Sequence, residues 1–282
     1  MTTTAAVAMV KDEADIIPTV ICHMMTQVDF IVVANNMSTD ATPKILDDLC
    51  AEFPTDHGRL DWDQPAGSRL LVVYDDDPAY EQSRKMTHLA HHAHDYFGAD
   101  WIVPFDADEI WYSPFHDTIS EALDAVGPQW LVVPCALYDH VATADDPEIF
   151  DEPDPVARLG WRRITKTAMP KVACRWREDL TIKMGNHGAS YAGGPTIFDE
   201  VLVARHFPNR SVDQLVRKVR NGAAAYKLTN FHESVGAHWR EWGQLLDQSG
   251  PSAIEDLFNE WYWSDDPGTD PTLIYDPAPV QR

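Results

Sequence analysis

The stretch "ADWIVPFDADEIW" (residues 99–111) joins an apolar run to a cluster of acids. The apolar residues 101–105 lead directly into Asp106, Asp108 and Glu109, and an Ile-Trp pair follows the acids. A short apolar run bounded by turn residues is typical of a buried strand. The Ile-Trp pair indicates that the acidic turn is clamped against the core instead of lying loose on the surface. We therefore predict one strand over 100–111, with carboxylates toward its carboxyl end.

Strands and helices are predicted to alternate about five times across residues 1–140. Such alternation is typical of an α/β domain with a mostly parallel sheet flanked by helices. Ligands of such sheets bind at the carboxyl ends of the strands, and three of the first four predicted strands end in acidic residues. The predicted strands cover 5–10, 29–36, 68–77, 100–111 and 129–140, and the predicted helices cover about 15–27, 38–53, 80–97 and 118–126.

The pattern changes after Tyr138. Residues 139–160 are rich in Asp and Pro, which predicts a loop or lid. Antiparallel strands are predicted within 162–176, followed by a glycine-rich turn over 184–195. Ser211 is a good N-cap for an amphipathic helix, and further helices and a proline-rich tail complete the chain.

Composition limits the classes of function. The net charge is -23, from 45 acidic and 22 basic residues, and such a surface repels nucleic acid and anionic lipid. No apolar run reaches the length of about 18 residues that predicts a transmembrane helix. The first residues, "MTTTAAVAMV", do not resemble a signal peptide, and the 4 cysteines are far apart without a CxxC pair. A cytoplasmic protein with reduced thiols is therefore expected.

Asp106 and Asp108 form a DxD sequence. Mg²⁺ and Mn²⁺ favour carboxylate oxygens and often keep a phosphate as co-ligand. A cation that bridges two phosphates stabilises a departing nucleoside diphosphate. The alternative is a solvated acidic turn. A second polar stretch, "NNMSTDAT" (residues 35–42), lies beside a predicted helix start, where it could bind phosphorylated groups or simply cap the helix.

Two other side-chain groups have both functional and structural interpretations. His88, His91 and His92 have helical spacing that could bind Zn²⁺ or Ni²⁺, or they could form a partly exposed helix face. Four tryptophans near the C-terminus could stack on an acceptor sugar, or they could fill a small core. These tryptophans are Trp239, Trp242, Trp261 and Trp263.

Four blocks of the chain, taken in order, resemble family 2-like glycosyltransferases with the GT-A fold. They are "VKDEADIIPTVICHMMTQVDFIVVANNMSTDATPKIL", "YEQSRKMTHLAHHAHDYFGADWIVPFDADEIW", "GNHGASY" and "RHFPNRSVDQLVRKVRNGAAAY". The resemblance covers roughly residues 7–226 and departs from the family pattern at Asp12, where Asn is more usual. Asp12 could accept a hydrogen bond from a base or ribose but could not donate one.

The resemblance implies a fold, an activity and a division of the chain. The fold is a GT-A (Rossmann-like) mostly parallel α/β sheet with a helical C-terminal extension. We assign residues 1–210 to the nucleotide-sugar-binding and catalytic domain, and 211–282 to a helical region packed on it. The implied activity is metal-dependent transfer of a sugar from a nucleoside-diphosphate sugar to an acceptor hydroxyl, with inversion.

The resemblance also implies roles for individual residues in donor binding. The expected nucleotide-pocket residues are Val10, Lys11 and Glu13, with Asn36, Ser38 and Asp40 near the base and ribose. Those expected beside the sugar diphosphate are Gln82 and Lys85. Asp106 would contact the ribose or the metal, Ala107 would line the pocket, and Asp108 would bind the metal.

Further candidates come from the second half of the chain. His187, in the "GNHG" turn, is expected as the third metal ligand, and His206 competes for that role. Basic residues expected to hold the diphosphate are Lys183, Arg205 and Arg210. For the catalytic base the candidates are Asp179, Glu178 and Asp199. "REDL" (residues 177–180) resembles the Glu-Asp pair of many family 2 enzymes, and an exposed acid pair is the alternative.

Two rival functions remain open at this point. A nucleotidyltransferase shares the α/β layout but usually has a glycine-rich basic first loop, and "MVKDEAD" has neither feature. A non-catalytic binding or assembly protein could retain the fold. The expected cofactors are Mn²⁺ or Mg²⁺ with a UDP-, GDP- or TDP-sugar. A glycan, a protein or a small molecule could be the acceptor, and the sequence does not indicate an oligomeric state.

Overall fold

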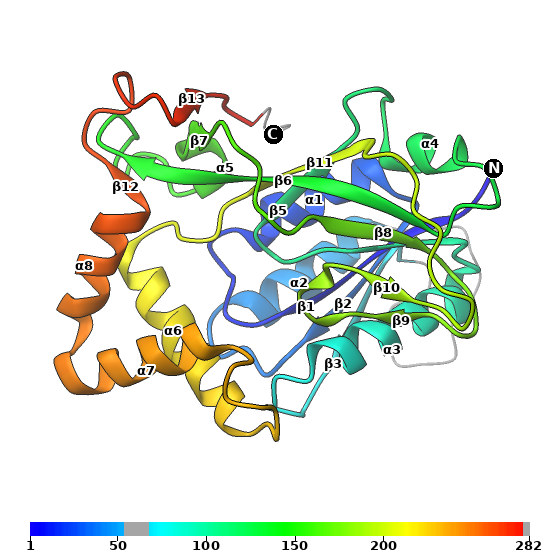
Figure 1. Ribbon diagram of the computed structural model, residues 1–282, viewed down its shortest axis with the longest axis horizontal. Helices are drawn as coiled ribbons and strands as arrows, with labels where there is room; N and C mark the ends of the chain where they lie inside the picture. The colour runs from blue at the N-terminus through cyan, green and yellow to red at the C-terminus, as the bar shows by residue number, and fades with distance from the viewer. Residues whose placement is uncertain (54–67, 279–282) are drawn as a thin grey trace.

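A long mixed sheet with helices on both faces forms the body of the protein (Figure 1). The computed structural model describes residues 1–53 and 68–278. Within these residues the sheet has 11 strands, and its main path runs β13-β7-β6-β8-β4-β1-β2-β3. The predicted α/β class is therefore confirmed.

The first four strands along the chain pair in parallel. The order β3-β2-β1-β4 places the strand nearest the N-terminus inside the sheet, and each strand pairs in parallel with its neighbours in this group. The strands are β1 (Thr4–Val10), β2 (Phe30–Asn35), β3 (Leu70–Tyr74) and β4 (Trp101–Pro104). Because the strands are buried on both faces, their sequences are nearly continuous apolar runs.

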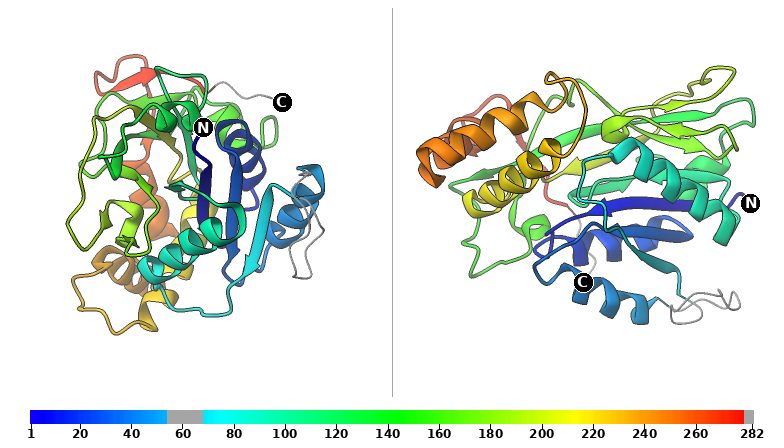
Figure 2. Two further views of the ribbon diagram at one scale, coloured as in Figure 1. Left: turned by 90° about the vertical axis from the view of Figure 1, so that its right-hand side faces the viewer. Right: turned by 90° about the horizontal axis from the view of Figure 1, so that it is seen from below.

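Helices cover the two faces of these parallel strands (Figure 2). Alternate residues of β1 belong to different apolar clusters: Ala6 and Ala8 lie with the α1 and α2 side, and Ala5 and Val7 lie with the α3 side. The small alanines let the helices approach the sheet closely. The helices are α1 (Ile17–Gln27), α2 (Thr42–Glu52) and α3 (Gln82–Phe97).

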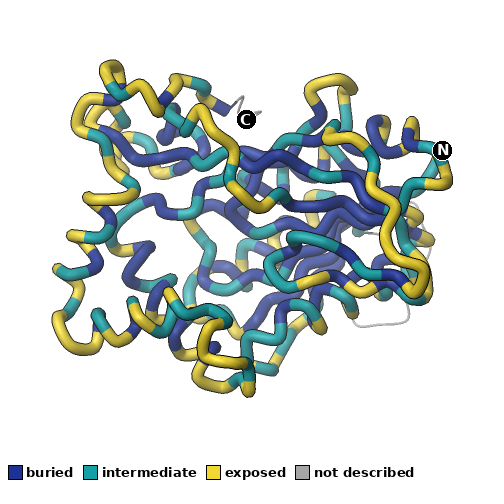
Figure 3. The backbone as a smooth tube through the Cα atoms, viewed as in Figure 1, coloured by how far each residue is buried: buried dark blue, intermediate teal, exposed yellow. Residues whose placement is uncertain are grey.

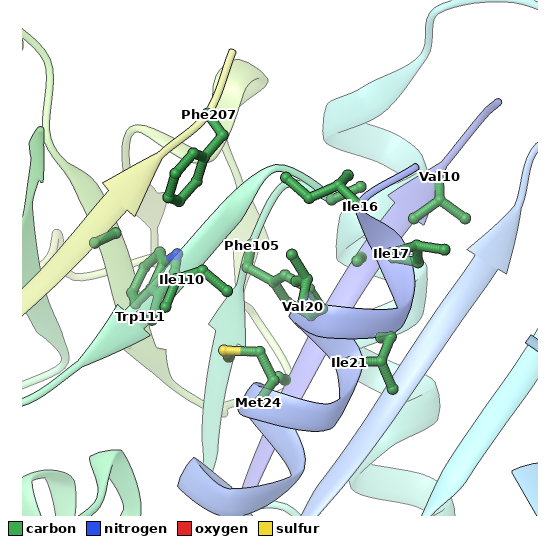
Figure 4. Close-up of a cluster of buried hydrophobic side chains, with 14 of the residues drawn as sticks. Val10, Ile16, Ile17, Val20, Ile21, Met24, Phe105, Ile110, Trp111 and Phe207 are labelled. Carbon is green, nitrogen blue, oxygen red and sulfur yellow. The ribbon is translucent and has the colours of Figure 1, made fainter. Parts of the chain in front are cut away.

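The single strand predicted over 100–111 is wrong, because the chain bends within it. β4 ends at Pro104, and β5 (Glu109–Tyr112) pairs with β11 instead of β1. The buried Glu109 carboxylate stabilises the bend: Oε2 accepts hydrogen bonds from the Asp106 amide at 3.1 Å and from Trp111 Nε1 at 2.8 Å. Phe105 and Trp111 pack beneath α1, so the acidic turn is clamped against the core, as predicted (Figure 4).

The second half of the sheet is built around one long strand, β6 (Val132–Thr143). The loop predicted from residue 139 is therefore wrong for its first five residues. They stay extended because β7 (Trp161–Arg163) and β12 (Trp263–Ser264) pair with them from far along the chain. The predicted antiparallel strands are confirmed, since β7 and β8 (Lys171–Arg175) both run antiparallel to β6.

The remaining elements are short, apart from three C-terminal helices. They are α4 (Ile119–Asp124), α5 (Pro155–Arg158), β9 (Thr181–Ile182), the 3₁₀ turn η1 (Met184–Asn186), β10 (Ala189–Ser190), β11 (Leu202–His206), α6 (Val212–Lys227), α7 (Ala237–Ser249), α8 (Pro251–Trp261) and β13 (Leu273–Tyr275). None of the helices in 1–53 and 68–278 combines the length and the apolar character needed to span a bilayer.

The C-terminal helices share one apolar core with the sheet. Ser211 caps α6 as predicted, with Oγ accepting a hydrogen bond from the Gln214 amide at 3.2 Å. Leu215 and Val219 of α6 and Phe258 of α8 belong to the cluster that also holds α1. Figure 3 shows how burial decreases from the sheet outward to these helices. The division of the chain at residue 210 remains a prediction.

Candidate functional site

Charged side chains gather where β4, β11 and α6 meet at the carboxyl end of the parallel strands. The turn after β4 carries Asp106 and Asp108, and β11 ends at His206. Residue pairing places His206 beside Glu109 of β5 and beside Asp139 of β6. The α6 helix approaches the same turn through Lys218. The carboxyl-end site expected for an α/β sheet is therefore built from residues of both halves of the chain.

Protein donors hold both carboxylate oxygens of Asp106. Lys171, which is 3% exposed, donates to Oδ2 of Asp106 and lies 3.0 Å from Oε1 of Glu109. Asn186 Nδ2 donates to Oδ1 of Asp106 at 3.0 Å, and Gln82 Nε2 lies 3.4 Å from the same oxygen. Burial raises the pKa of Glu109, and the ammonium of Lys171 only partly opposes this effect. Asp106 is thus a well-anchored carboxylate.

Asp108 lies deeper than Asp106 and has three cationic neighbours. Its Oδ2 atom is 2.7 Å from Lys218 Nζ and 3.9 Å from Arg210 Nη1, and its Oδ1 atom is 3.6 Å from His206 Nε2. Burial by itself would raise the pKa of Asp108, but Lys218, His206 and Arg210 outweigh it and hold that pKa well below its usual range. Asp108 is therefore a carboxylate at neutral pH.

His206 is oriented by a second carboxylate. Its Nδ1 atom lies 2.7 Å from Asp139 Oδ1, a normal hydrogen-bond distance, whereas 3.6 Å from Nε2 to Asp108 is too long for one. Burial by itself would lower the pKa of His206. The charges of Asp108 and Asp139 outweigh this effect, so the pKa is raised. Because Asp139 accepts the Nδ1 proton, Nε2 can face a cation once its own proton has left.

Asp108, Glu109 and His206 offer ligand atoms that all lie within 4.8 Å of one another. Oε1 of Glu109 is buried and makes no hydrogen bond of good geometry, although Lys171 forms an ion pair with it. Two carboxylates with an imidazole suit Mn²⁺ better than Mg²⁺, which prefers oxygen ligands alone. The residues present therefore fit a divalent cation.

The polar residues predicted to line the nucleotide pocket hold its loops together. Lys11 Nζ donates to the carbonyls of Asn36 and Met37 at 3.0 and 3.1 Å. Asp40 accepts hydrogen bonds from the amides of Ala14 and Thr42 at 3.1 and 2.8 Å. These contacts join the loop after β1 to the loop after β2. Val10 is buried at the end of β1, and Ala107 is buried in the acidic turn.

Protein groups bind both carboxylate oxygens of Asp12, and its contact with a base or ribose remains a prediction. Its Oδ1 atom accepts a hydrogen bond from the Thr39 amide at 2.6 Å, and its Oδ2 atom accepts one from Asn221 Nδ2 at 2.7 Å. The Asp12 amide donates to Ser38 Oγ at 3.0 Å, so Ser38 is also engaged within the loops. Asp12 has a φ of 55°, a left-handed conformation that Asp and Asn tolerate better than most residues.

The helix that follows β3 is tied to the same edge. Asn36 Nδ2 and Lys85 Nζ both bind Asp75 Oδ2, at 2.8 and 2.7 Å. Gln82 Oε1 accepts a hydrogen bond from the Gly185 amide at 2.7 Å, so the glycine-rich turn is held against α3. Protein groups therefore hold the polar atoms of Gln82 and Lys85, and their place beside a sugar diphosphate remains a prediction.

Arg210 is a structural cation at the centre of the site. It is 1% exposed, and its guanidinium binds Asp15 at 2.8 Å and Glu13 at 2.5 Å. The charge of Glu13 contributes most to raising the pKa of Arg210 against the effect of burial. Arg205, by contrast, binds Asp276 at 2.6 Å, away from the acidic turn. Neither arginine is free to hold a diphosphate in this arrangement.

The three predicted bases lie at the opposite end of the sheet. The Trp176 amide, just before Glu178 and Asp179, donates to the Asp100 carbonyl at the start of β4. The Phe198 amide, before Asp199, donates to the carbonyl of Val132 at the start of β6. At about 3.3 Å per residue, the length of β4 separates this end from Asp106 by roughly 15–20 Å. The structure does not bring these acids to the site.

His187 lies near enough to Asp106 and His206 for their charges to act on it, but neither it nor Lys183 belongs to the Asp108 ligand group. Nδ1 of His187 is 3.0 Å from the Pro170 carbonyl, and burial lowers the pKa of this histidine. Its ligand atoms are not among the clustered metal-ligating atoms of residues 1–53 and 68–278. Lys183 is exposed. Of the two histidines proposed as ligands, the geometry favours His206.

The histidines of α3 do not form a metal cluster within the described residues. His94 stacks on Trp176 with ring centroids 3.4 Å apart, and His92 packs on Tyr96. Trp239 and Trp242 pack against the core beside α6, whereas Trp261 and Trp263 are exposed. The possible Zn²⁺ site is therefore not supported, and only two of the four tryptophans present open faces.

Several residues of the site were not predicted from the sequence. Lys218 and Lys171 neutralise the DxD acids, Glu109 joins the ligand group, and Asp139 orients His206. Asp139 had a usable signal, because it lies at the end of the predicted strand 129–140. Lys171 and Lys218 had no such signal in the sequence, since their partners Asp106 and Asp108 lie 65 and 110 residues away along the chain.

The chain matches no protein-family model and no curated protein. Its strand order, β3-β2-β1-β4 with antiparallel strands beyond β4, is a GT-A-like layout. Similar solved structures include TarS 1-349 from S. aureus in complex with UDP, at 10% identity and a TM-score of 0.39, covering 88% of this chain and 73% of that one. A mycobacterial protein is 15% identical, with a TM-score of 0.37 and coverages of 79% and 71%. A mannose-1-phosphate geranyltransferase from Thermus thermophilus is 12% identical, with a TM-score of 0.31 and coverages of 94% and 70%.

Proposed function

We propose that this protein is a glycosyltransferase that moves a sugar from a nucleoside-diphosphate sugar to an acceptor hydroxyl, with inversion. The observation that carries the proposal is the convergence of Asp108, Glu109 and His206 at the carboxyl end of the parallel strands. This edge is where α/β sheets bind nucleotides. The family 2-like resemblance of the sequence blocks supports the same activity.

In this proposal, residues from both halves of the chain bind the cation and the nucleotide. Asp108 and His206 would hold Mn²⁺, and Asp139 orients the His206 ring. A bound divalent cation supplies positive charge that stabilises the departing diphosphate. Asp106, anchored by Lys171 and Asn186, lies beside this group and would contact the ribose. The loops after β1 and β2, which hydrogen bonds join, would form the floor of the nucleotide pocket.

The location and partners belong to the same proposal. The four free cysteines support a cytoplasmic protein with reduced thiols. The donor is a UDP-, GDP- or TDP-sugar, and the acceptor is a glycan, a protein or a small molecule. The net charge of -23 argues against nucleic acid as a partner.

Calorimetric titration with UDP, GDP and TDP, with and without Mn²⁺, tests the proposal. We expect one nucleotide to bind in a Mn²⁺-dependent manner, and Asp108→Asn to weaken that binding at least tenfold. Asp247→Asn is the matched control, because Asp247 is an exposed carboxylate of α7. The matching nucleotide sugar should then be hydrolysed slowly by the wild type.

Two outcomes would contradict the proposal. If no nucleoside diphosphate binds with Mn²⁺, a non-catalytic binding protein becomes the better description. If nucleoside triphosphates bind instead and a sugar phosphate releases pyrophosphate from them, the protein is a nucleotidyltransferase.

A further inference from the structure

A lysine from the C-terminal region holds the DxD carboxylate that would bind a cation. Nζ of Lys218 lies 2.7 Å from Oδ2 of Asp108 and donates to the Pro208 carbonyl at 2.9 Å. Pro208 belongs to the loop that follows His206. Lys218 therefore links the acidic turn after β4 to the segment that carries the histidine ligand.

The three cations around the acidic turn differ in their freedom to move. The Lys218 side chain is 24% exposed, whereas those of Lys171 and Arg210 are 4% and 1% exposed. Lys171 is shared by Asp106 and Glu109, and Arg210 is shared by Glu13 and Asp15. Among the described residues, Asp108 is the one carboxylate that pairs with Lys218. Lys218 is thus the cation that can leave without stranding a second carboxylate.

We propose that Lys218 is a positioning residue that competes with the divalent cation for Asp108, so that cation and nucleoside diphosphate bind cooperatively. The inference rests on the proposed function, because it takes Asp108 as a metal ligand. A divalent ion and an ammonium repel each other when both contact one carboxylate. In the nucleotide-free protein, Lys218 therefore weakens cation binding.

A nucleoside diphosphate removes this opposition. Its phosphate oxygens accept charge-assisted hydrogen bonds, and the flexible four-carbon stem of Lys218 lets the ammonium turn from Asp108 to them. The Pro208 carbonyl remains within reach as a second acceptor. The negative phosphates also offset the charge of the cation. Each ligand then raises the affinity of the other by the same factor, as linkage requires.

The test measures Mn²⁺ affinity without turnover, by electron paramagnetic resonance of free Mn²⁺. Wild type, Lys218→Met, Lys218→Gln and Asp108→Asn are compared with no nucleotide and with saturating UDP, GDP or TDP. Lys218→Gln retains a donor for Pro208, so it separates loss of charge from loss of the loop contact. Lys227→Met is the control, because Lys227 is an exposed lysine of the same helix. Circular dichroism confirms that each variant is folded.

Both Lys218 variants should bind Mn²⁺ at least tenfold more tightly than wild type in the absence of nucleotide. The factor by which the nucleotide raises Mn²⁺ affinity should be at least tenfold smaller in both Lys218 variants than in wild type. Lys227→Met should match wild type. Nucleotide-free affinity that is unchanged or weaker in Lys218→Gln overturns the inference, provided that Asp108→Asn abolishes Mn²⁺ binding. If Asp108→Asn binds Mn²⁺ normally, the metal assignment of the proposed function fails as well.

Discussion

The two ends of the sheet carry similar residues in very different surroundings. At the carboxyl end, Asp108 and its cationic partner Arg210 are 3% and 1% exposed. At the amino end, the side chains of Arg177 and Asp179 are 52% and 31% exposed and form an ion pair of 3.0 Å. Both places bring acids and an arginine together, but only at the amino end are they neighbours in the sequence. Only the carboxyl end combines burial with several charged elements.

The difference shows that burial decides how strongly a charged partner affects the pKa of a group and the stability of the fold. The pKa of Asp179 is lowered first by a hydrogen bond from the Ala192 amide and then by Arg177. The pKa of Asp108 is lowered against the opposing effect of burial, by three cations from β11, its following loop and α6. Removing a partner is therefore costly at the carboxyl end and nearly free at the amino end.

The largest expected contrast concerns stability. Arg210→Met should lower the free energy of unfolding by about 3–5 kcal/mol, because it breaks a buried ion pair and leaves Glu13 without its hydrogen-bonded counter-ion. Arg177→Met should change it by about 0–1 kcal/mol, since its ion pair is exposed. Urea denaturation of both variants measures the difference. Equal losses would show that the two ends do not differ as their burial indicates.

The next contrast concerns activity. Asp108→Asn should lower turnover of the nucleotide sugar at least 100-fold, about 2.7 kcal/mol of transition-state stabilisation. Asp179→Asn should leave turnover within about twofold, because Asp179 lies at the wrong end of β4 to accept the acceptor's proton. Steady-state kinetics of both variants decide this. A large loss in Asp179→Asn would restore it as the catalytic base.

A smaller effect is expected from pH. The folded-state pKa of His206 is raised above its unfolded value near 6.5, so its contribution to stability is complete below that pH. The contribution is lost as pH rises through the folded pKa, and a difference of one between the two pKa values is worth about 1.4 kcal/mol. The free energy of unfolding should therefore decline in wild type as the pH rises above about 6.5. His206→Gln should lack the part of this decline that comes from His206. An identical decline in the variant would show that His206 does not contribute to it.

The smallest effect concerns Asp12. Asp12→Asn introduces the residue more usual at this position and keeps the left-handed backbone, but it puts an amide in place of one acceptor. The contact with Asn221 should weaken, and the free energy of unfolding should fall by less than about 1 kcal/mol. Nucleotide affinity should stay unchanged, because Asp12 is satisfied by Thr39 and Asn221. A tenfold change in UDP, GDP or TDP affinity would mean that Asp12 contacts the base.

Much of the fold was predictable because its signals are local. Apolar runs and amphipathic spacing located β1, β2, β3, α1 and α6, and Ser211 marked the start of α6. The bend between β4 and β5 was missed because the partner that turns the chain, β11, is about 90 residues away. The end of β6 was missed for the same reason, since β7 and β12 pair with it.

The sequence predicted the location of the site better than it predicted the residues that form the site. The acidic turn and His206 do meet at the carboxyl edge. Glu178 and Asp179 do not, because β8 runs antiparallel to β4 and carries Trp176 and the acids after it to the amino end. Asp199 lies at the same end, because the Phe198 amide donates to the Val132 carbonyl at the start of β6. A short motif such as "RED" does not encode the direction of its strand. Lys171 was unforeseeable because its partners follow a different strand.

The sequence by itself determined where most of the strands and helices lie, and that acidic residues follow β4, because apolar periodicity and turn residues act over a few positions. Tertiary structure alone decided which charges meet. Asp108, Asp139, His206 and Lys218 come from four separate elements, and only their packing brings a carboxylate, an imidazole and an ammonium within 4 Å. Charge pairing is set by distance and burial, and neither quantity is written in the order of the residues.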